Sequence, residues 1–108
     1  MTMKIEWTLF ALDRVDVLTE FIARKNPEAA VRAIDELFNR VAILAEQPEL
    51  GHVVEALGEP SIRQMYFGVY RVIYLVDRPS SSILILAAQY GKEAPYSTEE
   101  LEQLATVG

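Results

Sequence analysis

The feature that most constrains the fold is a run of strand-forming residues, SIRQMYFGVYRVIYLV, at positions 61–76. β-branched and aromatic side chains dominate this run, and Gly68 divides it as a hairpin turn would. Another apolar run, SILILAAQ, follows after a polar turn that contains Pro79. We therefore predict an antiparallel meander of three strands, at 61–67, 69–76 and 82–89.

The first half of the chain predicts two helices after a short strand at 3–7. Between 9 and 24, apolar residues recur at intervals of three and four, and Asp13, Arg14, Asp16 and Glu20 supply much of the polar side. Asn26 is a good N-cap and Pro27 suits the first helical position, so a second helix should begin there and end near Gln47. The short connection makes the two helices an antiparallel hairpin.

The remaining segments complete the order of elements. Residues 52–60 have no sustained period and predict a loop. Ser97 and Glu100 form a capping-box pattern that predicts a short C-terminal helix at 97–106. We expect one α+β domain over residues 1–108, with a βααβββ order: an N-terminal strand, an antiparallel αα-hairpin packed on a small antiparallel β-sheet, and the C-terminal helix.

Composition excludes several classes of function. The chain has no cysteine, which removes disulfides and thiolate metal sites and suggests a reducing cytoplasm. We expect neither a signal peptide nor a membrane span. The net charge of -6 argues against general affinity for nucleic acid. His52, the single histidine, fits a solvated loop better than a metal site, and no phosphate-binding motif is present, so we expect no metal and no cofactor.

The presence of Arg63 and Arg71 requires an explanation, because charged residues are unusual in such an apolar run. Alternation places Arg71 on the side of Ile73 and Leu75. The two arginines could project from the same face of the sheet, which would make a cationic site, but the register between the strands does not follow from the sequence. Alternatively, each arginine lays its stem on the sheet and pairs with a helix carboxylate.

Several segments together resemble one protein family. The chain has IEW in the first strand, FIARKNPEAAVRAIDEL across the helices, PELG after them and IRQMYFGVYRVIYLVD in the hairpin. In this order they resemble the RelE/ParE superfamily of type II toxin-antitoxin toxins, closest to the ParE-like branch, over about the first 90 residues. The resemblance implies a toxin that a cognate antitoxin neutralises by folding across its surface, and hence a toxin-antitoxin oligomer.

The resemblance also implies two possible targets. ParE-like members inhibit DNA gyrase by binding, whereas RelE-like members cleave mRNA on the ribosome without a metal, so whether this chain is an enzyme stays open. The candidate residues for target contact or RNA cleavage are Arg63, Arg71, Lys92 and Tyr96, as phosphate stabilisers and proton donors.

The ribonuclease constellation is incomplete in this chain. Glu93 stands where a second arginine would be expected, and the segment before the sheet is acidic. These departures and the net charge of -6 favour the ParE-like function over the RelE-like one. A third alternative is a toxin-derived remnant that only binds its partner.

Overall fold

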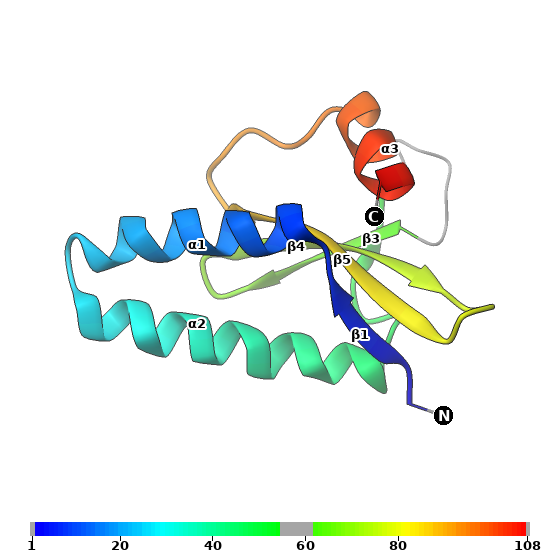
Figure 1. The fold of residues 1–108 in the computed structure, drawn as a ribbon, viewed down its shortest axis with the longest axis horizontal. Coiled ribbons are helices and arrows are strands. Elements are labelled where there is room, and N and C mark those ends of the chain that lie inside the picture. Colours follow the sequence, from blue (N-terminus) through cyan, green and yellow to red (C-terminus); the bar gives the residue numbers. More distant parts are fainter. Residues whose placement is uncertain (1, 55–61, 108) are drawn as a thin grey trace.

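The computed structural model describes residues 2–54 and 62–107 and confirms the predicted α+β fold. Within these residues, three α-helices and one 3-10 helix pack around a single sheet (Figure 1). The strands are β1 (Lys4–Trp7), β2 (His52–Val53), β3 (Ile62–Phe67), β4 (Tyr70–Asp77) and β5 (Ser82–Tyr90). The helices are α1 (Leu9–Ala23), α2 (Pro27–Val41), η1 (Ala42–Ala45) and α3 (Thr98–Val107).

The sheet has the order β1-β5-β4-β3-β2 and is mixed. Strands β3, β4 and β5 form the predicted antiparallel meander, whereas β1 pairs with β5 in parallel. The αα-hairpin therefore lies within a long crossover between two parallel neighbours, which sequence order alone does not reveal. Strand β2 pairs with β3 and lies in the segment that we predicted as a loop. The prediction missed this strand because two residues are too few to show alternation. Residues 55–61 lie outside the described residues. They include most of the loop predicted at 52–60 and the first residue of the strand predicted at 61–67.

The helix ends follow their capping residues. The Asn26 side chain accepts a hydrogen bond from the Ala29 N–H at 3.1 Å, and Pro27 opens α2 as predicted. In the capping box of α3, Ser97 N–H donates to Glu100 Oε1 at 2.9 Å while Glu100 N–H donates to Ser97 Oγ at 3.1 Å. The predicted second helix is split between α2 and η1, so the chain tightens before it leaves the hairpin.

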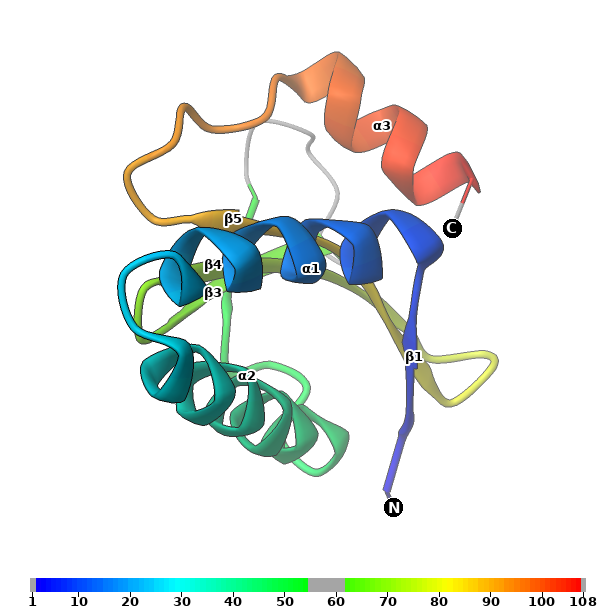
Figure 2. The same ribbon diagram turned by 60° about the vertical axis from the view of Figure 1, so that its left-hand side comes forward.

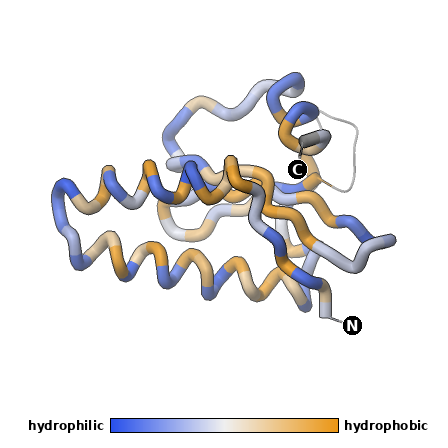
Figure 3. The backbone as a smooth tube through the Cα atoms, in the orientation of Figure 1, coloured by the Kyte–Doolittle hydropathy of each residue, from blue (hydrophilic) through white to orange (hydrophobic). Residues whose placement is uncertain are grey.

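The sheet separates two apolar cores. The αα-hairpin covers one face and α3 covers the other (Figure 2). On the hairpin side, Val15, Leu37 and Tyr74 belong to one cluster, while Ile73 and Leu101 belong to the cluster under α3. The middle strands are therefore apolar almost throughout, whereas the helices alternate between apolar and polar residues (Figure 3).

A β-bulge in β5 allows one strand to serve both cores. The pairing with β4 runs from Tyr70↔Tyr90 to Ile73↔Ala87 and resumes at Tyr74↔Ile85, so Leu86 is the extra residue. Leu86 and Ala87 consequently both belong to the core under α3, while Ile85 and Ala88 belong to the hairpin-side core.

Candidate functional site

The register of the β3–β4 hairpin places Arg63 and Arg71 on opposite faces of the sheet. Arg63 lies opposite Tyr74, whose ring belongs to the hairpin-side core, whereas Arg71 lies opposite Tyr66 on the other face. A shared cationic site, which the sequence left open, therefore does not form. The two arginines must be considered separately.

Arg63 holds the loop that follows the helical hairpin. Its Nη1 donates to the carbonyls of Glu49 at 3.2 Å and Gly51 at 2.8 Å. The Tyr74 hydroxyl holds the same loop from below, since it donates to the Pro48 carbonyl at 2.9 Å and accepts from the Gly51 N–H at 2.8 Å. The PELG motif is thus the partner of an arginine and a tyrosine in the sheet.

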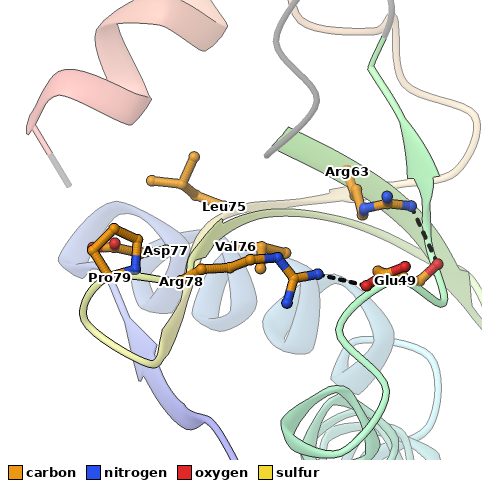
Figure 4. Close-up of a pocket in the computed structure, with 7 residues that line it drawn as sticks. All are labelled: Glu49, Arg63, Leu75, Val76, Asp77, Arg78 and Pro79. Atoms are coloured by element: carbon orange, nitrogen blue, oxygen red, sulfur yellow. Dashed lines mark hydrogen bonds and ion pairs between the residues drawn. The ribbon is translucent and has the colours of Figure 1, made fainter.

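A polar hollow of about 570 Å³ lies beside this loop (Figure 4). Arg63 and Arg78 line it together with Glu49 and Asp77. Arg78 pairs with Glu49 through an Nη2–Oε1 contact of 2.5 Å. The hollow therefore holds both signs of charge, and its electrostatics do not select an anionic ligand.

Arg71 performs a similar task on the other face, and it is only 6% exposed. Its guanidinium donates to Gln89 Oε1 at 2.7 Å, to the Gly91 carbonyl at 3.0 Å, to the Tyr66 hydroxyl at 3.3 Å and to the Glu93 carbonyl at 3.4 Å. It also lies over the Tyr66 ring, 5.5 Å from the centroid. All three guanidinium nitrogens thus have acceptors on β3, on β5 or in the segment after β5, and none of these acceptors is a helix carboxylate.

The residue that does make such a pair is Arg14, which the sequence placed on the polar side of its helix. Its Nη2 contacts Glu93 Oε1 at 2.6 Å, and its Nε donates to the Ala88 carbonyl at 2.9 Å. Glu93 Oε1 also accepts from the Tyr90 N–H at 3.0 Å. Arg14 and Glu93 were missed because their partners lie more than 70 positions apart in the chain. Helical spacing puts Arg14 on the same side of α1 as Phe10 and Phe21, and this pattern in the sequence was the available signal.

The other two candidate residues lie in the segment held by these contacts. Lys92 is exposed. Tyr96 is half-buried, and its ring packs edge-on against Phe10 with centroids 6.2 Å apart. Burial raises the pKa of the Tyr96 phenol above its ordinary value, with partial opposition from the nearby Arg14. The phenol is therefore protonated at neutral pH and can donate a hydrogen bond but cannot act as a base.

A groove opens at the end of the molecule where the αα-hairpin turns. We call it the hairpin-end groove; its volume is about 330 Å³. It is lined by Leu18, Phe21, Ile22, Lys25, Asn26, Ala29, Ala33, Val69, Tyr70 and Tyr90. The groove thus brings together the end of α1, the start of α2 and the turn between β3 and β4. Its lining is mainly apolar and carries one charged side chain, Lys25, which makes it a better candidate for a binding site than the hollow beside Arg63.

Residues 2–54 and 62–107 contain no group of three or more His, Asp or Glu side chains arranged to hold a metal ion. Over the same ranges, no helix is both long enough and apolar enough to cross a bilayer.

Solved structures support the fold at low sequence identity. The chromosomal ParDE toxin-antitoxin system of P. aeruginosa has a chain with a TM-score of 0.66 and 20% identity, covering 82% of this chain and 96% of that one. A chain of the RelBE2 toxin-antitoxin complex of Mycobacterium tuberculosis gives 0.58 and 16%, with coverage of 83% and 99%. The isolated E. coli RelE toxin gives 0.59 and 14%, with coverage of 94% and 98%.

Sequence comparisons are more specific. A Sinorhizobium fredii protein named "Putative toxin Y4kP" is 40% identical over 48 residues, which is 44% of this chain and 50% of that protein. The chain therefore matches about half the length of this curated relative. The family model of the ParE toxin of the type II toxin-antitoxin system parDE matches residues 5–95, from β1 to the segment held by Arg71 and Arg14. The chain thus belongs to the ParE family of type II toxin-antitoxin toxins.

Proposed function

We propose that this toxin inhibits DNA gyrase by binding to it and does not cleave mRNA. The observation that carries the proposal is the environment of Arg71, the strand arginine that would stabilise a phosphate in a ribonuclease. Its guanidinium is buried and bonded to four acceptors of its own chain.

Metal-free RNA cleavage requires a cation that can reach the phosphorane, and a general acid and base beside it. A phosphate that took the place of Gln89 or Gly91 at the guanidinium would leave that acceptor without its donor, and Gln89 is buried. The Glu93 carboxylate beside it would repel the developing negative charge. These contacts support a structural role for Arg71 and a toxin that acts by binding.

We also propose that a cognate antitoxin binds the chain, since the P. aeruginosa and M. tuberculosis relatives are described as parts of toxin-antitoxin systems. Exposed apolar side chains that a partner could cover fit this proposal. Leu9, Phe21, Val31 and Val69 are between 47% and 85% exposed. Lys92 and Tyr96 remain candidates for contact with the target.

A RelE-like ribosomal nuclease is the second candidate, and one observation favours it. The E. coli RelE chain covers 94% of this chain, against 82% for the P. aeruginosa chain, so more of the present chain has a counterpart there. Under this alternative, Lys92 and Tyr96 would supply the cation and the proton, since both lie in the segment after β5 that Arg71 and Arg14 hold.

The test is tightly induced expression of the chain alone in a bacterial host, with pulse incorporation of thymidine and methionine during the first minutes. We expect thymidine incorporation to fall first, and purified toxin to inhibit supercoiling by gyrase. An early fall of methionine incorporation with cleaved mRNA would replace the proposal by the RelE-like one. If neither label changes while folded protein accumulates, the chain is a partner-binding remnant.

A further inference from the structure

Tyr96 contacts two residues of α1 that lie one helical turn apart. Its ring packs edge-on against the Phe10 ring, with centroids 6.2 Å apart. Arg14 follows Phe10 by four positions, so both side chains reach the segment after β5 from the same side of the helix. The contacts with α1 therefore limit where the Tyr96 hydroxyl can lie.

The Arg14 guanidinium is itself held from two sides. Its Nε donates to the Ala88 carbonyl of β5 at 2.9 Å, and its Nη2 donates to Glu93 Oε1 at 2.6 Å. The same Glu93 oxygen accepts from the Tyr90 N–H at 3.0 Å, which ties the carboxylate to the end of β5 as well. The guanidinium is thus fixed both by the sheet and by the segment that carries Tyr96.

The pKa of the Tyr96 phenol depends on these neighbours. Burial, the largest effect, raises the pKa. The charge of Arg14 and a hydrogen bond from its side chain lower the pKa, whereas the charges of Glu93 and Glu100 raise it. A guanidinium has donors and no acceptor, so the phenol oxygen must accept from Arg14. The phenol hydrogen then points away from the guanidinium, where an acceptor on a partner could reach it.

We propose that Arg14 is a positioning residue for the contact between this toxin and gyrase, because it fixes the Tyr96 hydroxyl as a donor to a carbonyl or carboxylate oxygen of the enzyme. The inference rests on the proposed function, in which Tyr96 is a candidate for contact with the target. Arg71 holds the same segment by other bonds, to the carbonyls of Gly91 and Glu93. Loss of Arg14 should therefore change the hydroxyl more than the course of the chain.

The first test is the titration of Tyr96 in Arg14→Met, followed by NMR of isotopically labelled tyrosine, with Tyr96→Phe to assign the signal. We expect the pKa of Tyr96 to rise further, because the charge and the hydrogen bond that lower it are lost while burial remains. Glu93→Gln should lower the pKa, because it removes a charge that raises it. If Arg14 only held the segment in place, Arg14→Met would expose Tyr96 and lower its pKa toward the ordinary value.

The second test is inhibition of supercoiling by purified gyrase. Arg14→Met and Tyr96→Phe should each weaken inhibition by about tenfold. The double variant should be no weaker than either single variant, because both act through one hydroxyl. Arg24→Met makes the same change at the exposed end of α1 and should inhibit within about twofold of the original chain. Thermal melting should show that every variant folds.

Other outcomes would overturn the inference. A lower pKa of Tyr96 in Arg14→Met, or unchanged inhibition by that variant, would exclude a positioning role. If Arg14→Met does not fold, Arg14→Gln, which keeps a donor at this position but no charge, is measured in its place. The titration does not involve gyrase. If the original chain fails to inhibit supercoiling while Arg14→Met still raises the pKa of Tyr96, the gyrase proposal fails and the positioning of Tyr96 by Arg14 stands.

Discussion

Gly51 and Tyr74 are fitted to each other. A Cβ atom at Gly51 would lie 2.6 Å from the Tyr74 hydroxyl and 2.7 Å from the Gln64 carbonyl oxygen, both closer than real contacts allow. The same hydroxyl bridges the Gly51 N–H and the Pro48 carbonyl inside the protein. Burial raises the pKa of the Tyr74 phenol, so the hydroxyl is protonated at neutral pH and can donate. The glycine of PELG is thus required by a tyrosine 23 positions later.

We predict that Tyr74→Phe lowers the free energy of unfolding by about 1–3 kcal/mol, because the Gly51 N–H and the Pro48 carbonyl lose their partner. Gly51→Ala should cost more than Tyr74→Phe, because the buried tyrosine cannot withdraw. Urea denaturation measures both changes. Tyr90→Phe serves as the control, since the structure records no hydrogen bond of that hydroxyl within the described residues. An unchanged midpoint for Tyr74→Phe would refute the bridging role.

At the scale of elements, the segment after β5 is held to the domain by two arginines from different elements. Arg71 of β4 donates to its carbonyls, and Arg14 of α1 pairs with its carboxylate at Glu93. Gln89 completes the arrangement, since its Nε2 donates to the Ala94 carbonyl at 2.9 Å. This segment leads directly into α3, so these bonds also set the position of that helix.

Arg71→Met should therefore release the segment and loosen α3. The variant retains the apolar stem but leaves the acceptors on Gln89 and Gly91 without a donor, and each bond to a charged group is worth about 1.5–3 kcal/mol. We expect faster hydrogen exchange in 98–107, while the amides of α2 keep their protection. Arg78→Met, which removes an exposed arginine, is the control. Lost toxicity with unchanged exchange would instead make Arg71 a target contact.

The sequence predicted what depends on local pattern and missed what depends on register. The alternation of β4 and the caps at Asn26 and Ser97 follow from neighbouring residues, and the structure confirms them. The opposite faces of Arg63 and Arg71 depend on which residues pair across the hairpin, which no local pattern specifies. Arg14 was assigned to the solvent because its acceptors come from the far end of the chain.

At the scale of the whole molecule, the sheet separates two cores that contribute unequally to the fold. The hairpin-side core holds most of the large buried side chains, whereas the core under α3 depends on Leu101 and a few residues of the sheet. The family model ends at residue 95, before α3 begins. The part of the chain that matches the family model thus does not include α3, the helix that covers this face of the sheet.

We predict that Leu101→Asp undocks α3 without unfolding the hairpin-side core. Burial of an unpaired carboxylate on that face is prohibitive, so the helix should detach and expose Ile73 and Leu86. Binding of an apolar dye should rise. The fluorescence spectrum of Trp7, the single tryptophan, should stay native, because its ring packs on the Phe38 ring with centroids 4.7 Å apart. The exposed Gln103→Asp is the control. A shifted Trp7 spectrum in Leu101→Asp would show that the two cores unfold together.

The parallel pairing of β1 with β5 affects when the protein can become active during its synthesis. Lys4 lies beside Ser82 and Trp7 beside Ile85, so the first strand cannot join the sheet until the last has left the ribosome. At bacterial rates of translation this delay is on the order of ten seconds. The helices are complete long before then, and their apolar sides have no sheet to cover. A newly made toxin would therefore expose the apolar sides of its hairpin before its fold is complete. An antitoxin could bind it at that stage, before the toxin is able to act.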